Sequence, residues 1–209
     1  MLLPIVAGLL LWDRLPDKIA THFGPGNQPD GWSGKPFAVF GLPLIMLAVH
    51  GLTILPLLLD PKVKNLPSAV INLCLWIVPS CSLLVSVLCY LMALGRAVDV
   101  GFFVALFFGI LLVAIGNYLP KCRLNNTVGI RVPWTLADED NWAFTHRLGG
   151  WVWTAGGLLV ILFAFLGRTT LFMPVIALVC IVPVAASYLY WRRNSEKEKR
   201  KFPNGRDGC

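Results

Sequence analysis

Charged side chains are scarce in this sequence. Asp, Glu, Lys and Arg make up 14% of its 209 residues, whereas 56% are hydrophobic. The mean hydropathy is +0.70, and ordinary soluble domains carry about 25% charged residues. The composition therefore excludes an ordinary soluble domain and predicts an integral membrane protein.

The sequence also lacks the short motifs of common enzyme classes. Neither G-x-S-x-G nor H-E-x-x-H occurs. A membrane hydrolase could pair His146 with Asp138 or Asp140, but these acids precede the histidine by eight and six residues and share no helical turn with it. Two related halves with broken helices, the mark of a small transporter, are not evident. We therefore expect no enzyme and no cofactor.

No C-x-x-C pair occurs among the six cysteines. Four lie in apolar runs, where a free thiol behaves as a small apolar side chain: Cys74, Cys81, Cys89 and Cys180. Cys122 and Cys209 fall on the expected cytoplasmic side, where thiols stay reduced. These positions predict neither disulfides nor a metal site.

Long apolar runs dominate the rest of the chain, and a helix of about 20 residues crosses a hydrocarbon core of roughly 30 Å. The candidate spans are Phe37–Leu59, Ala69–Leu94, Val98–Leu119, Gly150–Leu166 and Leu171–Trp191. The fourth is short, so its helix could begin earlier. Met1–Trp12 is expected to be a sixth, abbreviated span rather than a signal peptide, because no Lys or Arg precedes it and no small-x-small site follows it. The predicted fold is all-α and polytopic, with about six transmembrane helices and an interfacial cytoplasmic segment.

The basic residues are distributed unevenly across the predicted topology. Thirteen of the 18 Lys and Arg residues lie on the side of the N-terminus and five on the other. Because cytoplasmic loops are enriched in Lys and Arg, we expect both termini in the cytoplasm and residues 13–36 outside. We divide the chain into an N-terminal module (1–68), a transmembrane core (69–191) and a basic tail (192–209). The tail suits anionic lipid headgroups, and direct nucleic-acid binding is not expected.

Residues 120–150, PKCRLNNTVGIRVPWTLADEDNWAFTHRLGG, form an unusually polar stretch between two apolar runs. Thr135 and Asp138 resemble a capping box, which predicts a helix that begins near Leu136, runs along the interface and bends at Gly149–Gly150 into the next span. Trp142, His146 and Gly150 recur four apart on one face of this helix.

The segment before that helix can lie at headgroup depth only if its backbone polar groups find partners. Candidate partners are Asn117, Asn125, Asn126 and Arg131. We expect Arg131 and His146 to lie in one polar cluster, with Asn117 and Asn125 nearby. A simpler interpretation is an aromatic belt whose arginines hold lipid phosphates, formed by Trp134, Trp142, Trp151 and Trp153.

The order GNYLPK…N…GIRVPWTL…W…THRLGG resembles the C-terminal signature of the SdpI family of bacterial membrane proteins. In that signature an Asn closes a span, G-I-R-[ST]-P-W-T follows, and W-x-x-T-H-R leads into the next span; Val132 departs from it in replacing the small polar residue. The matching positions include Lys121, Pro133, Thr135 and Thr145. The functional cluster that we expect from the match is Asn117, Asn125, Gly129, Arg131, Trp134, Trp142, His146 and Arg147.

The segment LPDKIATHFGPGNQPDGWSGK resembles the same family's N-terminal module, L-P-x-x-[IV]-x-x-H-[FW] followed by a glycine-containing turn and an aspartate. Two tight turns are expected to fold His22 and Asp30 towards each other. A zinc-like site would need a third or fourth ligand, so turn stabilisation or ligand contact is the preferred interpretation.

His50 is the one ionisable residue deep inside a predicted span, about 13 Å from its end at 1.5 Å per residue. Intramembrane ionisable residues are functional candidates. The expected state is nevertheless a neutral ring bonded to a serine, such as Ser80, or to a backbone carbonyl.

The resemblance implies an immunity protein of the bacterial cell membrane that counters a secreted antimicrobial peptide toxin. The best-known relative also holds a transcriptional autorepressor at the membrane. The expected partners are thus a peptide toxin near His22 and Asp30, a cytoplasmic repressor near residues 123–147 or the tail, and membrane lipids. A transporter or an enzyme acting on a small amphiphilic or lipid-linked substrate remains the alternative, since one fold can host several functions.

Overall fold

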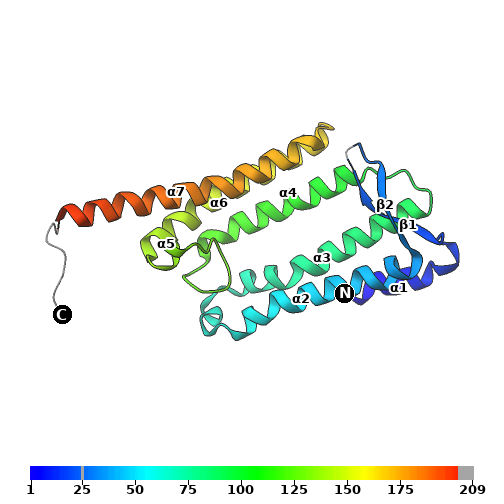
Figure 1. Cartoon of the computed structure of the whole chain (residues 1–209), viewed down its shortest axis with the longest axis horizontal. Helices are drawn as coiled ribbons and strands as arrows, with labels where there is room; N and C mark the ends of the chain where they lie inside the picture. The colour runs from blue at the N-terminus through cyan, green and yellow to red at the C-terminus, as the bar shows by residue number, and fades with distance from the viewer. Residues whose placement is uncertain (25, 202–209) are drawn as a thin grey trace.

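The structure is a computed structural model that describes residues 1–24 and 26–201, with side chains described as far as residue 197. Within these residues the chain is mostly helical and forms an elongated bundle (Figure 1). Its elements are α1 (Leu2–Leu10), β1 (Lys18–Phe23), β2 (Pro29–Gly34), α2 (Leu42–Leu59), α3 (Ser68–Ala93), α4 (Val100–Tyr118), α5 (Pro133–Leu136), α6 (Glu139–Phe165) and α7 (Phe172–Lys201).

The described residues contain five helical segments that are long and apolar enough to cross a membrane. They are Phe37–Leu59, Ser68–Ala93, Val100–Lys121, Glu139–Phe165 and Thr169–Lys197. The first includes a π-helical turn (Phe37–Gly41) that leads into α2. The predicted polytopic helical class is confirmed, and the last span continues beyond the predicted end at Trp191 into the basic tail. Residues 202–209, including Cys209, lie outside the described part.

α1 corresponds to the expected abbreviated span. It has nine residues, which rise about 14 Å, and it is not among the five long segments. The hydroxyl of Tyr90 on α3 donates to the carbonyl of Pro4 at 3.1 Å, and Gly8 faces Val39 and Tyr90. α1 is therefore a short helix packed beside α3, and it is too short for a full crossing.

The start of α6 corrects the prediction for the polar stretch. In place of an interfacial helix from Leu136 that bends into the span, α6 is one continuous helix of 27 residues that begins at Glu139. Asp138 is its N-cap and accepts hydrogen bonds from the backbone N–H groups of Asp140 (2.9 Å) and Asn141 (3.2 Å). The predicted capping box failed because Thr135 belongs to the separate short helix α5.

Close packing against α4 explains two of the four glycines of α6, Gly150 and Gly157. A Cβ atom on Gly116 would lie 2.8 Å from the carbonyl oxygen of Gly150, and one on Gly157 would lie 2.6 Å from the carbonyl oxygen of Gly109. Small residues of this kind let two membrane helices approach closely. Gly109 and Gly116 thus pack α4 against α6 of the same chain.

The predicted turns between α1 and α2 form part of a β-hairpin that the sequence analysis missed. Strands β1 and β2 pair antiparallel, with Lys18 opposite Gly34. Ile19 and Ala20 are both buried, so β1 lacks the strict in–out alternation that identifies a strand, and its register shifts after Ala20. Ile19 belongs to the same buried cluster as Cys89 and Tyr90 of α3, which docks the hairpin onto the bundle.

The loops gather at two opposite ends of the bundle (Figure 1). The hairpin end carries β1, β2 and the α3–α4 and α6–α7 connections. The loop end carries the α2–α3 connection, residues 119–138 and the far end of α7. The two regions singled out from the sequence thus lie a full bundle length apart.

Candidate functional site

We call residues 122–132, between α4 and α5, the connecting loop. Its conformation is stabilised by hydrogen bonds from side chains rather than by regular backbone pairing. Asn125 is fully buried at its centre. Its amide donates to the carbonyls of Arg123 (2.8 Å) and Val128 (2.9 Å), and its oxygen accepts from the N–H groups of Thr127 (2.8 Å) and Val128 (2.6 Å). Because buried backbone groups need partners, this one side chain folds the loop into a compact turn.

Asp60, just after α2, ties the connecting loop to the α2–α3 connection. Its carboxylate accepts from the N–H groups of Lys62 (2.9 Å) and Asn126 (3.0 Å) and from the hydroxyl of Thr127 (2.9 Å). These hydrogen bonds, that of Lys62 first, hold the pKa of the Asp60 carboxyl below its ordinary value. The sequence analysis missed Asp60; its one signal was an Asp-Pro pair at the end of a span, which is typical of a turn.

His146 braces the other side of the loop from within α6. Its ring is buried and stacks on Trp142, with centroids 3.9 Å apart. Nε2 accepts the backbone N–H of Ile130 at 3.1 Å, and Nδ1 lies 2.8 Å from the carbonyl oxygen of Trp142. Because Nε2 accepts a hydrogen bond, the imidazole is neutral and carries its proton on Nδ1, which donates to that carbonyl.

The same contacts argue against a hydrolase that uses His146 as its general base. A general base needs a ring nitrogen within reach of a substrate proton, but backbone groups engage both nitrogens of His146. Asp138, one of the two acids considered as its partner, caps α6 instead.

Gly129 allows the loop to approach this ring. Its φ is +126°, a conformation that residues with a Cβ atom rarely adopt. A Cβ atom here would lie 2.2 Å from Nε2 of His146 and 3.1 Å from Cη2 of Trp142. The glycine of the G-I-R motif therefore serves both the backbone turn and the contact with His146.

Arg131 belongs to the connecting loop through its side chain. Its guanidinium donates to the carbonyl of Asn126, and it follows Ile130, the residue bonded to His146. Asn125 and Arg131 thus bond loop carbonyls, as expected of them. Asn117 is exposed on α4, and its side chain takes part in none of the side-chain hydrogen bonds found among the described residues, so its expected role as a partner of the loop stays a prediction.

Two further residues of the expected cluster point elsewhere. Trp134 faces α7, where its indole N–H donates to the hydroxyl of Ser187 at 2.8 Å and its ring lies against Tyr188. Arg147 is exposed on α6 and lines a cavity at the loop end. The aromatic-belt interpretation fits Trp151, which is 75% exposed, but not Trp142, which is buried and donates to the carbonyl of Cys122 at 2.8 Å.

A second buried network, also missed from the sequence, joins α6 to α7. The side-chain amide of Asn141 donates to the carbonyls of Ser187 (3.2 Å) and Trp134 (3.4 Å), and its oxygen accepts from the hydroxyl of Thr145 (3.1 Å). Asn141, Thr145 and Ser187 are fully buried. The spacing of four between Asn141 and Thr145 could have identified them as one polar helix face.

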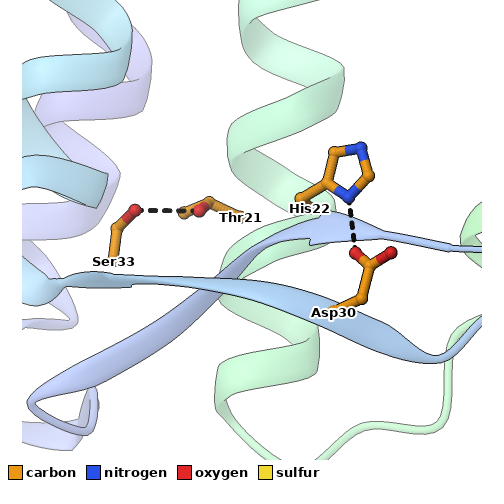
Figure 2. Close-up of polar contacts among 4 residues, drawn as sticks. All are labelled: Thr21, His22, Asp30 and Ser33. Atoms are coloured by element: carbon orange, nitrogen blue, oxygen red, sulfur yellow. Dashed lines mark hydrogen bonds and ion pairs between the residues drawn. The ribbon is translucent and has the colours of Figure 1, made fainter.

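At the hairpin end, His22 and Asp30 face each other across the two strands, as predicted (Figure 2). His22 Nδ1 lies 2.5 Å from Asp30 Oδ1, and the side chains are 74% and 49% exposed. A pair this exposed contributes at most about 1 kcal/mol to folding. Both side chains are therefore open to a partner.

Asn27, at the hairpin tip, fastens the hairpin to the connection between α3 and α4. Its φ is +64°. Its amide donates to the carbonyl of Val98 and its oxygen accepts from the N–H of Val100, both at 2.8 Å. Asn27 is only partly exposed, whereas Gly26 and Gln28 beside it are exposed. Beside it opens a cavity of about 610 Å³, lined in part by Asp99 and Phe172.

The expected bond of His50 is absent from the structure. Its Nδ1 atom is buried without a hydrogen-bond partner among the described residues, and the hydroxyl of Ser80 lies 2.7 Å from the carbonyl oxygen of Trp76 in its own helix. A serine within a helix satisfies its hydroxyl locally in this way, so Ser80 is not available to His50.

The described residues hold no group of three or more His, Cys, Asp or Glu side chains placed to bind a metal ion. The free cysteines among them are Cys74, Cys81, Cys89, Cys122 and Cys180. Burial raises the pKa of the Cys122 thiol to about 11, so this thiol is protonated at neutral pH.

These features define a multi-pass helical membrane protein with a docked hairpin at one end and a braced loop at the other. Residues 121–187 match the model of the SdpI/YfhL protein family, and residues 1–47 match that of a domain of unknown function (DUF1648). The chain is similar to the immunity protein SdpI of Bacillus subtilis (strain 168), with 28% identity over 199 residues, 91% of this chain and 92% of the relative. No solved structure matches it. The chain is therefore similar to the SdpI/YfhL family over residues 121–187 and to the immunity protein SdpI over most of its length.

Proposed function

We propose that this chain is an integral membrane immunity protein that protects a bacterium against a secreted antimicrobial peptide toxin. The observation that carries the proposal is the similarity to the immunity protein SdpI over 91% of the chain. The family models that match residues 1–47 and 121–187 cover the hairpin and the connecting loop. An enzyme or a transporter for an amphiphilic substrate is less well supported, because the best catalytic candidate, His146, has both ring nitrogens bonded to the backbone.

The proposal assigns the hairpin end to the outside of the cell, and the loop end and the basic tail to the cytoplasm. Support comes from the excess of Lys and Arg at the loop end and in the tail. The toxin then meets the exposed pair His22 and Asp30 and the cavity beside Asn27.

The proposed second role is recruitment of a cytoplasmic autorepressor at the loop end. The observation that favours it is the set of exposed basic side chains there, which includes Arg131, Arg192 and Arg193. Coupling of the two ends would need an element with two arrangements that both partners bias. The α3–α4 unit, clamped to the hairpin by Asn27, is that element in this proposal.

Expression of the chain in a toxin-sensitive bacterium tests the main proposal. We expect growth at toxin concentrations that kill cells expressing an unrelated multi-pass protein at equal membrane abundance. Survival no better than that of the control, across several secreted peptide toxins, would contradict an immunity function.

A cysteine at Gln28 tests the orientation, in a background with Cys122 and Cys209 replaced. Gln28 is exposed at the hairpin tip, whereas a change at Asn27 would break its bonds to Val98 and Val100. Intact cells should be labelled by an impermeant thiol reagent. Labelling only after permeabilisation would reverse the proposed topology.

A further inference from the structure

The loop end contains a cavity of about 770 Å³. Its walls come from the α2–α3 connection, the residues that follow α4 and the first nine residues of α6. Four basic side chains line it: Lys62, Lys121, Arg123 and Arg147. Glu139 is the acidic residue on its wall, so the lining carries an excess of positive charge. We call this site the basic cavity.

The four basic side chains of the basic cavity take part in no ion pair among the residues that the structure describes. Among the residues that the structure describes, the ion pairs are His22–Asp30, Lys35–Asp17 and Arg192–Glu196, and none includes a cation of the cavity. Lys121 lies over the ring of Tyr118 at 4.7 Å, and all four residues are exposed. Their charges are therefore available to an anionic ligand.

The wall behind these cations is rigid. Trp142, which lines the cavity, is 3% exposed and donates its indole N–H to the carbonyl of Cys122 at 2.8 Å. The α2–α3 connection, which supplies Lys62, is tied to the connecting loop by the bond from Asn126 N–H to Asp60. The basic side chains thus project from a preformed frame, which lowers the ordering cost of binding.

The depth of the cavity indicates the source of the anion. Trp151, one helical turn after Arg147 on α6, is 75% exposed, and exposed tryptophans of membrane helices sit at the headgroup level. Basic pockets between membrane helices bind anionic lipid headgroups. We propose that the basic cavity binds the phosphodiester headgroup of an anionic phospholipid, with Arg123 and Arg147 as its main contacts.

Native mass spectrometry of the purified full chain tests this proposal, with phosphatidylglycerol or phosphatidylcholine of the same acyl chains added. We expect phosphatidylglycerol to bind preferentially. The double variant Arg123→Gln/Arg147→Gln should lose about tenfold or more of that binding. The matched control Arg96→Gln/Arg168→Gln removes the same charge at the hairpin end, where both residues are exposed, and should bind as wild type does.

A gain of binding provides a second readout that unfolding cannot mimic. Glu139→Gln removes the acidic side chain of the cavity wall and should strengthen phosphatidylglycerol binding. Equal loss in both double variants, or no preference for phosphatidylglycerol, would overturn the site. Displacement of the lipid by inorganic phosphate or by hexaglutamate at equal charge concentration would assign the cavity to a soluble anion or an acidic protein segment, and would overturn the lipid assignment.

Discussion

The two ends of this bundle are built in opposite ways. At the loop end, Asn125 and His146 are buried and their polar atoms are bonded to the chain's own backbone. At the hairpin end, His22 and Asp30 are bonded to each other but remain largely exposed. A polar side chain saturated by its own protein serves the fold, whereas an exposed one can still be used by a partner. The strongest sequence motif therefore marks mainly a structural element.

Among the variants that test this comparison, Gly129→Ala is expected to lose the most folding stability. The new Cβ atom would lie 2.2 Å from Nε2 of His146 at a φ of +126°, so the cost combines backbone strain with overpacking, about 2–4 kcal/mol. We expect a large drop in the thermal unfolding midpoint and in membrane abundance.

Gly167→Ala is the matched control for that change. Gly167 also has a positive φ, +68°, but a Cβ atom there meets nothing within 4 Å. This variant should lose only about 1 kcal/mol of folding stability, which is the cost of the backbone strain. Equal losses in the two variants would show that the loop does not depend on its contact with His146.

A smaller loss is expected for His146→Ala, which leaves the N–H of Ile130 without its acceptor and removes the stack on Trp142. An unpaired buried donor costs about 1–3 kcal/mol. His146→Gln keeps a side-chain acceptor and should recover part of the unfolding midpoint. A midpoint for His146→Ala equal to that of wild type would show that the imidazole is not a brace.

Asp60→Asn should have a smaller effect that depends on pH. The pKa of Asp60 is lowered in the folded protein, so its stabilisation is complete above the unfolded pKa of about 3.9 and is lost as the pH falls through the lower folded value. The gap in unfolding midpoint between wild type and Asp60→Asn should therefore be constant near neutral pH and close below about pH 4. A gap that widens in acid would contradict the assignment.

Much of the fold could be predicted because hydropathy reports directly on membrane helices. The span Phe37–Leu59 has the predicted ends. The hairpin could not be predicted, because Ile19 and Ala20 are buried side by side and hide the strand period. The start of α6 was misplaced because Asp138 rather than Thr135 caps it.

The sequence identified the site residues by type but could not assign their contacts. His146 and Gly129 are 17 residues apart in the sequence. Only the folded structure shows that the glycine leaves room for the imidazole ring. Asp60 was missed because its partners, Asn126 and Thr127, lie more than 60 residues away along the chain. The division into three parts at residues 68 and 191 stays a prediction.

The most direct test of the account is protection by His22→Ala at matched membrane abundance, with Arg131→Ala alongside it. His22 is a surface residue whose loss should change stability by no more than about 0.5 kcal/mol, so abundance should hold while protection against the toxin falls. Arg131→Ala, at the opposite end of the bundle (Figure 1), should retain more protection and lose more repressor recruitment. Full protection by His22→Ala, or equal loss of both activities in both abundant variants, would contradict the division of roles between the two ends.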